Sequence, residues 1–334
     1  MTPQPAPTDR AHRPYPSRNL APLILGLTGP KHQRYAAESV LWDNREVNFG
    51  ALLTAMVTPF DANGQIDEAA TVRLLAHLFE TGSDGVVVCG TTGEAATLSD
   101  QEHLAMIALV VNQVRVNHPG KTVVAGVGSN DTRHAVHLTA AASALRPDGL
   151  LSVNPYYNRP SRAGVIAHYR EVDQATDLPV LLYNIPQRTG ADLPNDLLAE
   201  LAQLEHIVGV KQANAANLAK IDGLSIYAGN DEDLIDVLAL GEPGGICTLS
   251  HVFGREFRRA IDQPQDRAAF NDSLADAYRD MGIAPLAVTN KAALNLIGMD
   301  VGGPRLPYVS LDLDETNLIR AMLERHGLLQ AAHS

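Results

Sequence analysis

The chain has 334 residues, enough for one large domain or two ordinary ones, and hydrophobic residues make up 45% of it. Its formal net charge is −12, and no block of basic residues interrupts the acidic balance. We therefore expect neither a nucleic-acid partner nor binding to an anionic membrane.

The first 47 residues differ in composition from the rest. Residues 1–16 are rich in Pro, Thr and Ala, which is typical of disordered segments. The apolar stretch 20–27 faintly resembles a signal peptide, but it contains Pro22 and is followed by Lys31-His32-Gln33-Arg34 instead of small cleavage-site residues. No apolar run is long enough to cross a bilayer. We predict a partly disordered N-terminal extension over residues 1–47 and a cytoplasmic protein.

From Phe49 onward, short apolar runs alternate with amphipathic segments. Apolar runs bounded by loop residues predict strands buried on both faces. The predicted strands are Leu52–Thr58, Gly85–Cys89, Thr122–Val127, Gly149–Val153, Pro179–Tyr183, Ile207–Lys211, Ser225–Ala228 and Gly245–Thr248.

Helical patterns lie between and after these strands. The second one opens with Ser99 and Glu102 in capping-box spacing, which marks a helix start. The predicted helices are Asp67–Thr81, Ser99–Asn117, Thr132–Ala144, Arg162–Ala175, Pro194–Gln203, Ala215–Asp222 and Asp231–Leu240, then helices within Arg255–Ile261, Asp266–Met281, Ala284–Ile297 and Thr316–His326.

Eight strands, each followed by a helix, predict an α/β fold in the form of a closed (β/α)₈ TIM barrel. A doubly wound open sheet is the alternative, but it normally carries a Gly-rich phosphate turn after its first strand, where this chain has Thr58-Pro59-Phe60. We predict the catalytic barrel over residues 48–253 and an appendage of C-terminal helices over 254–334.

Two cysteines, Cys89 and Cys247, each lie in an apolar run, so buried packing is the expected role and no disulfide is predicted. The 12 histidines form no metal-binding motif. We therefore predict no metal and no cofactor.

Lys211 ends the apolar run Ile207-Val208-Gly209-Val210. Burial of an ammonium group lowers its pKa, and a less basic lysine is a nucleophile towards carbonyl carbon. The alternative is a strand that surfaces and leaves Lys211 in solvent. In a TIM barrel, chemistry takes place where strands end, so Lys211 should share one mouth with the residues that follow the other strands.

Those residues offer a consistent set of chemical groups, although each has an ordinary structural alternative. The glycines around Thr91 and Thr92 free backbone amides for a carboxylate, or form a common turn. Tyr183 suits proton relay, or is a core tyrosine. Arg188 offers a planar fork for a carboxylate, or pairs with a surface acid. Tyr156-Tyr157 suits insertion into another subunit, or packs within its own loop.

Four motifs in order resemble the dihydrodipicolinate synthase / N-acetylneuraminate lyase family of class I, pyruvate-dependent barrel enzymes. The resemblance runs from about Phe49 to the C-terminus. The motifs are Gly90-Thr91-Thr92-Gly93-Glu94, Asn154-Pro155-Tyr156-Tyr157-Asn158-Arg159-Pro160, Tyr183-Asn184-Ile185-Pro186-x-Arg188-Thr189-Gly190 and Gly209-Val210-Lys211.

The resemblance implies that Lys211 forms a Schiff base with pyruvate and that the enamine derived from it attacks an aldehyde. Apart from this covalent imine, no cofactor is expected. It implies that Tyr183 carries protons, with Thr91 and a partner subunit's equivalent of Tyr157 completing the relay. The resemblance also implies that Thr91 and Thr92 hold the pyruvate carboxylate. It further implies that the backbones of Gly229 and Ile246 line the pyruvate pocket. A homotetramer built as a dimer of dimers is usual in the family.

Arg188 separates the branches of the family. Its place in the third motif resembles the synthases, where it binds the carboxylate of aspartate semialdehyde, the aldehyde of lysine and diaminopimelate biosynthesis. The alternatives are a lyase or aldolase of a 2-keto-3-deoxy sugar acid, and a non-catalytic relative that binds a keto acid.

The chain departs from the family's pattern at three places. Gln212-Ala213-Asn214 follows the lysine where many synthases have an acidic and then a small residue. Ala95 replaces a common serine. Asp100 and His134 stand where lysine-inhibited members have a histidine and a glutamate.

Overall fold

The structure is a computed structural model that describes residues 47–329, all within one compact unit over Asn44–Ser334. Residues 1–46 of the predicted extension lie outside the described residues.

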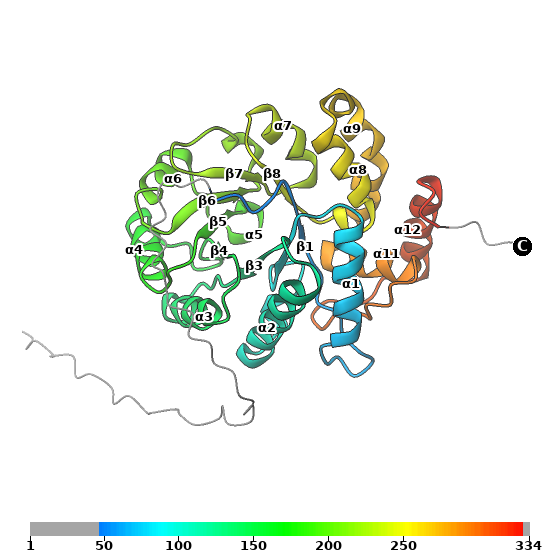
Figure 1. The fold of residues 1–334 in the computed structure, drawn as a ribbon, viewed down its shortest axis with the longest axis horizontal. Coiled ribbons are helices and arrows are strands. Elements are labelled where there is room, and N and C mark those ends of the chain that lie inside the picture. The colour runs from blue at the N-terminus through cyan, green and yellow to red at the C-terminus, as the bar shows by residue number, and fades with distance from the viewer. Residues whose placement is uncertain (1–46, 330–334) are drawn as a thin grey trace, which may run out of the picture. The chain divides into compact units, whose positions relative to one another are not determined.

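Eight parallel strands close into a barrel in chain order, which confirms the predicted fold (Figure 1). Each observed strand overlaps a predicted one. The first ends at Ala55 instead of Thr58, because Val57 N–H donates to His251 Nε2 (3.1 Å) and not to a neighbouring strand. The strands are β1 Leu52–Ala55, β2 Gly85–Val88, β3 Thr122–Gly126, β4 Gly149–Val153, β5 Val180–Asn184, β6 Ile207–Gln212, β7 Ser225–Ala228 and β8 Gly244–Cys247.

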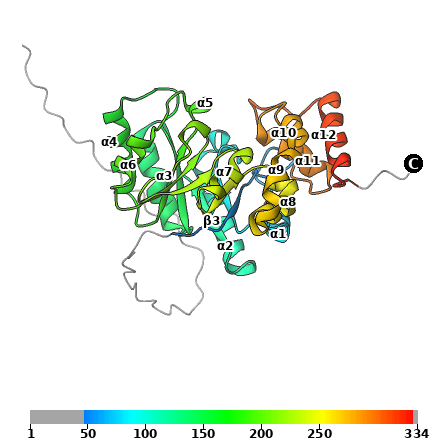
Figure 2. The same ribbon diagram turned by 90° about the horizontal axis from the view of Figure 1, so that it is seen from above.

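Helices surround the barrel, and the C-terminal helices α8–α12 gather to one side of it (Figures 1 and 2). Ser99 and Glu102 form the predicted capping box of α2. The helices are α1 Glu68–Glu80, α2 Asp100–Asn117, α3 Thr132–Ala144, α4 Arg162–Asp173, α5 Pro186–Thr189, α6 Asn195–Leu201, α7 Leu234–Ala239, α8 Ser250–Asp262, α9 Arg267–Ser273, α10 Ala275–Met281, α11 Leu286–Leu296 and α12 Leu313–Arg325, with short 3₁₀ turns η1 Ala95–Thr97, η2 Ala215–Asn217, η3 Asp231–Asp233 and η4 Pro264–Asp266.

Two helix predictions were wrong. The segment 215–222 forms only η2, because Asn214 Oδ1 caps Ala216 N–H (3.2 Å) and Asn217 Nδ2 donates to Asp192 (2.8 Å). Such side-chain hydrogen bonds offer the backbone an alternative to the helix. The helix predicted over 266–281 is broken at Leu274, whose φ of −114° and ψ of 6° are not helical.

The barrel buries an outer and an inner layer of side chains. Alternate residues of each strand face the helices or the barrel interior, as the period of two in a strand requires. The outer layer is the larger cluster and includes the apolar faces of the helices. The inner one contains Phe49, Leu53, Ala55, Val87, Val124, Leu151, Leu181, Tyr183, Ile185, Val208, Ala213, Tyr227 and Ile246.

A bulge in β6 determines which way Lys211 points. Val180 pairs with Ile207, but Leu181 pairs with Gly209, so Val208 is an extra residue. Ile207 belongs to the outer layer, and unbroken alternation from it would turn Lys211 outward. The extra residue reverses the alternation, so that Val210 packs outside and Lys211 faces the interior beside Tyr183.

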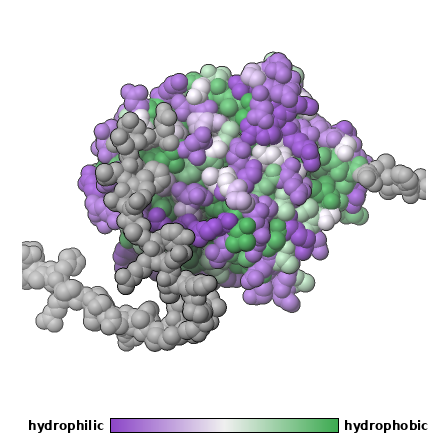
Figure 3. Space-filling model, viewed as in Figure 1, coloured by the Kyte–Doolittle hydropathy of each residue, from purple (hydrophilic) through white to green (hydrophobic). Residues whose placement is uncertain are grey.

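Hydrophilic residues dominate the coloured part of the face in Figure 3, with smaller apolar patches between them. Over the described ranges, no helix combines the length and apolarity needed to span a membrane.

Gly209→Ala is expected to lower the free energy of unfolding by about 1–3 kcal/mol, the usual cost of overpacking. The added Cβ would lie 2.6 Å from Ser225 O and 2.7 Å from Leu181 Cδ2. Urea denaturation measures this change. Gly164→Ala in α4 is the control. Its added Cβ would come no closer than 3.2 Å to another atom, Pro160 Cβ, and alanine has a higher helix propensity than glycine. An unchanged midpoint for Gly209→Ala would contradict tight packing at the bulge.

Candidate active site

A cavity of about 390 Å³ opens at the carboxyl ends of the strands, where barrel enzymes place their chemistry. It brings together six of the residues singled out from the sequence, from four different strand ends. They are Thr91, Thr92, Tyr183, Arg188, Lys211 and Gly229. Ile246 lies in the inner layer of the barrel with Tyr183 and does not line the cavity.

Lys211 is buried, with 4% of its surface exposed, and its Nζ lies 4.6 Å from the centre of the Tyr183 ring. Loss of water around the ammonium group lowers the pKa of Lys211 to about 8, although the negative charge of Asp231 opposes this change. At pH 7 roughly a tenth of such a lysine is the neutral amine, against less than a thousandth of an ordinary one. The site therefore holds a nucleophilic amine.

Asp231 supplies the negative charge that faces this lysine. Its carboxylate accepts hydrogen bonds from Thr248 N–H (2.7 Å), Thr248 Oγ1 (2.7 Å) and Leu249 N–H (2.9 Å). Three donors hold this buried carboxylate in place. Asp231 was not among the residues predicted from the sequence, although its position in the turn after β7 was a usable signal.

Tyr183 stands on β5 beside Lys211, and 6% of its surface is exposed. Burial raises the pKa of the Tyr183 phenol, and Asp231 adds to this while Arg188 opposes it. Tyr169 and Tyr227, which are also buried, have hydroxyl groups that hydrogen-bond to the backbone. Among residues 47–329 the Tyr183 hydroxyl has no such partner, so it is a protonated donor that can act on a molecule in the cavity.

The loop after β2 places two threonines on the cavity wall. Thr91 is exposed and Thr92 is buried. The turn is closed by a hydrogen bond from Glu94 N–H to Thr91 O (3.1 Å), and Thr58 Oγ1 holds Gly93 O (2.6 Å). A Cβ at Gly93 would lie 3.1 Å from Met56 O, so the loop packs closely on β1.

Arg188 lies in α5, the short helix after β5, and forms no ion pair with any described residue. The alternative of a surface arginine paired with an acid therefore does not hold within residues 47–329. The cavity thus carries a guanidinium group that can bind an anion.

Tyr157 is 89% exposed and does not line the cavity. Its φ of 72° is in the left-handed region, and its N–H donates to Thr189 O (3.1 Å). The structure thus holds Tyr157 at an outward loop tip, and it does not line the cavity with the other candidate residues of the same chain.

The residue after Lys211 faces away from the cavity. Gln212 Oε1 accepts hydrogen bonds from Asn184 Nδ2 (2.9 Å) and Asn214 N–H (3.0 Å). Asn184 in turn donates to Asp192 (2.8 Å). The substitution of an acid by Gln212 thus alters a hydrogen-bond network on the outer side of β6, not the group next to the Lys211 amine.

The C-terminal helices form a wall of the cavity that was not predicted from the sequence. Tyr278 of α10, Tyr308 and the start of α11 line the cavity, together with Glu232 from η3. No local motif marks Tyr278 or Tyr308, because their positions depend on how the C-terminal helices pack on the barrel, whereas Glu232 lies next to Asp231 in the turn after β7.

A second cavity of about 470 Å³ adjoins the first and shares Thr91, Tyr183, Arg188 and Tyr308 with it. It extends to Tyr156 and to Asp100 and His134, which are joined by a hydrogen bond between Asp100 Oδ1 and His134 Nε2 (2.9 Å). Within residues 47–329, no cluster of three or more His, Cys, Asp or Glu side chains is placed to hold a metal ion.

The family model described as "Dihydrodipicolinate synthetase family" matches residues 48–326. A 4-hydroxy-tetrahydrodipicolinate synthase from Synechococcus sp. (strain JA-2-3B'a(2-13)) is 40% identical over 296 residues, which cover 85% of this chain and 95% of the relative.

Two solved structures have the same fold at a TM-score of 0.79. The dihydrodipicolinate synthase of Cyanidioschyzon merolae with lysine bound is 34% identical and matches over 84% of this chain and 99% of its own. The chloride-inhibited dihydrodipicolinate synthase of Acinetobacter baumannii complexed with pyruvate is 32% identical, over 84% and 100%.

Asp231→Asn is expected to shift the pH midpoint of Lys211 reactivity below the wild-type value of about 8, because Asp231 raises the pKa of Lys211. The rate of carbamylation by cyanate, followed across pH by mass spectrometry of the Lys211 peptide, measures the neutral amine. Asp233→Asn is the matched control, since Asp233 bonds to Asn230 and does not line the cavity. Equal shifts in the two variants would contradict a specific role of Asp231.

Proposed function

The chain belongs to the dihydrodipicolinate synthetase family, and we propose that it condenses pyruvate with L-aspartate 4-semialdehyde to 4-hydroxy-tetrahydrodipicolinate. This is the activity for which its curated relatives are named, and it belongs to lysine and diaminopimelate biosynthesis. The observation that carries the proposal is the desolvated Lys211, whose pKa of about 8 leaves a usable fraction of neutral amine in a cavity that also holds Arg188.

Lys211 performs the chemistry by forming a protonated imine, which acts as an electron sink. The neutral Lys211 amine attacks the ketone carbon of pyruvate, and water leaves as the imine forms. The protonated imine draws electrons from the methyl group, which loses a proton and becomes the nucleophilic carbon of an enamine. That carbon attacks the aldehyde, and the amino group of the second substrate then displaces Lys211 as the ring closes. This sequence needs no cofactor or metal, because the iminium itself accepts the electron pair.

The surrounding residues hold and move protons in this proposal. The protonated Tyr183 hydroxyl is the proton carrier to and from the imine, with Thr91 next in the relay. Asp231 balances the positive charge of the imine. Thr91 and Thr92 bind the pyruvate carboxylate, and the backbone of Gly229 completes the pocket. At Gly229 a Cβ would lie 2.7 Å from the backbone of Gln212, so no larger residue fits there without a shift.

The second substrate is a zwitterion, and the cavity offers charges of both signs to match it. Arg188 is suited to the α-carboxylate of aspartate semialdehyde. Glu232, which lines the same cavity and forms no ion pair with a described residue, is suited to the α-ammonium group. A sugar acid has no ammonium group to use this carboxylate, and no observation favours the lyase or the non-catalytic alternative.

We further propose that the protein acts in the cytoplasm as a homotetramer. The assembly is supported by the exposed loop tip at Tyr157, a large aromatic residue in contact with solvent. In a dimer, the partner's copy of this residue is suited to complete the relay of Tyr183 and Thr91.

Lys211→Ala is expected to abolish the covalent adduct that borohydride traps between the protein and pyruvate, and to reduce the condensation rate at least about 10³-fold, since the covalent route is lost. Mass spectrometry of the peptide and a coupled assay with pyruvate and aspartate semialdehyde measure the two effects. Lys220→Met is the control, because Lys220 lies outside the cavity and should leave both unchanged. A wild-type protein that forms no adduct would overturn the proposed function.

Glu232→Gln is expected to raise KM for aspartate semialdehyde about tenfold, which corresponds to about 1.4 kcal/mol, and to leave KM for pyruvate unchanged. Succinate semialdehyde, which lacks the ammonium group, provides the matched probe. Its inhibition constant should be the same for the wild type and the variant. If Glu232→Gln weakens both aldehydes equally, Glu232 does not recognise the ammonium group.

A further inference from the structure

A buried ion pair connects the threonine loop to the C-terminal helices. Lys291 Nζ of α11 lies 2.6 Å from Glu94 Oε1, and the exposed fractions of the two side chains are 1% and 0%. Lys291 Nζ also donates to Gly303 O (2.9 Å) and lies 4.1 Å from the centre of the Phe60 ring. Glu94 is the residue directly after Gly90-Thr91-Thr92-Gly93.

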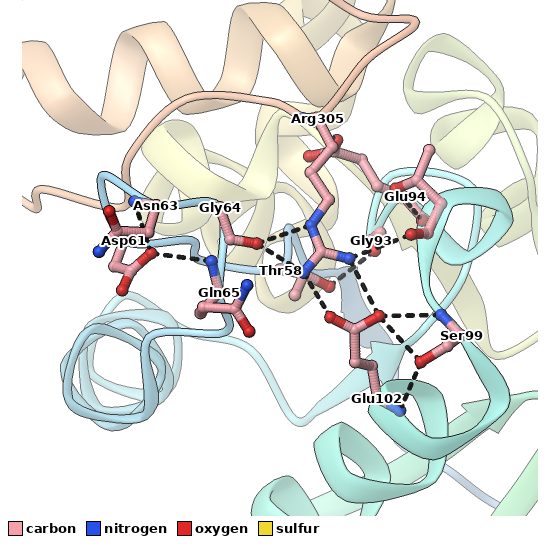
Figure 4. A network of polar contacts seen from close by, with 11 residues as sticks. Thr58, Asp61, Asn63, Gly64, Gln65, Gly93, Glu94, Ser99, Glu102 and Arg305 are labelled. Carbon is pink, nitrogen blue, oxygen red and sulfur yellow. Dashed lines mark hydrogen bonds and ion pairs between the residues drawn. The ribbon is translucent and has the colours of Figure 1, made fainter.

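The second oxygen of the Glu94 carboxylate continues the network. Glu94 Oε2 accepts a hydrogen bond from Arg305 N–H (2.8 Å), as Figure 4 shows. The Arg305 guanidinium donates to Glu102 (2.5 Å), to Gly64 O (2.5 Å) and to Thr97 O (3.0 Å). One carboxylate thus holds two separate segments of chain, residues 90–94 and the segment that begins at Arg305.

Both segments form the wall of the cavity. The first carries Thr91 and Thr92, and the second leads from Arg305 to Tyr308. Glu94 itself has a φ of 55°, a left-handed conformation that is unfavourable for a residue other than glycine. A strained residue persists where its surroundings over-determine it, and such residues gather at functional sites.

Stability alone does not account for this pair. A buried ion pair gains little over well-packed apolar residues of the same size, because both ions lose their water. Removal of one partner is destabilising, because it leaves the other charge buried and uncompensated. Such a pair is therefore better suited to define geometry than to add stability.

We propose that Glu94 and Lys291 are positioning residues that hold the Thr91–Thr92 loop and Tyr308 in place against Lys211, so that the C-terminal helices help to build the pyruvate site. The kinetic part of this proposal rests on the proposed function, whereas its structural part, the ordering of the two segments, does not.

The test compares Glu94→Gln, Lys291→Met and the double variant Glu94→Gln/Lys291→Met, each of which keeps the approximate shape of the side chain. The single variants are expected to unfold more easily, because each leaves a buried charge unpaired. The double variant removes both charges, so its thermal midpoint should return towards that of the wild type. Its KM for pyruvate should nevertheless stay raised about tenfold or more, with KM for the aldehyde changed much less.

Arg325→Met is the matched control within the same helices. It breaks the ion pairs to Asp276 (2.9 Å) and Asp280 (2.6 Å), which join α12 to α10 and do not contact either segment. This variant should lose stability while its KM for pyruvate stays unchanged. If the double variant regains the wild-type KM together with its stability, the pair is only structural and the proposal is wrong.

Amide hydrogen exchange provides a readout that does not depend on the reaction. In the double variant, exchange should accelerate in residues 90–97 and 304–308 and remain unchanged around β6. Unchanged exchange in both segments would overturn the proposal. If the wild-type protein formed no pyruvate adduct, the proposed function would fail, and the exchange data would still decide whether the pair orders the two segments.

Discussion

The burial of the Lys211 ammonium group inside the barrel is the constraint on which the site depends. An unpaired cation in a water-poor interior is unfavourable, and two features of the structure reduce this cost. The pKa falls to about 8, so that part of the population is neutral, and Asp231 offers a compensating charge to the rest. The same two features suit the proposed mechanism, in which Lys211 alternates between a neutral amine and a protonated imine.

This balance demands that the countercharge stay where it is. The Asp231 carboxylate accepts three hydrogen bonds from Thr248 and Leu249, the two residues that follow β8. Closed pairing of all eight strands keeps β5, β6 and β8 at fixed distances, so Tyr183 stays beside Lys211, and the donors to Asp231 follow directly on β8. In the proposed function, a strand thus carries the reacting group, Lys211, and loops carry the groups proposed to bind the substrates.

The C-terminal helices are part of the site, not a separate attachment. Tyr278, Tyr308 and the first turn of α11 close the cavity, and the Glu94–Lys291 pair ties α11 to the loop with the two threonines. α8 crosses residue 253, where we predicted the boundary of the barrel, with a kink at Phe253. The described residues on both sides of that position belong to one compact unit.

The sequence by itself determined the eight strands, most of the helices, and the set of polar residues at the strand ends. This was possible because periodicity and capping act between residues that are close in the chain. It could not determine that Lys211 points inward, since that depends on the extra residue Val208 in the pairing of β5 with β6. Nor could it find Tyr278, Tyr308 or the partner of Glu94, because these side chains come from the C-terminal segment, far in the sequence from the strand ends. Only the tertiary structure decided these contacts, since burial and charge pairing depend on distance in space.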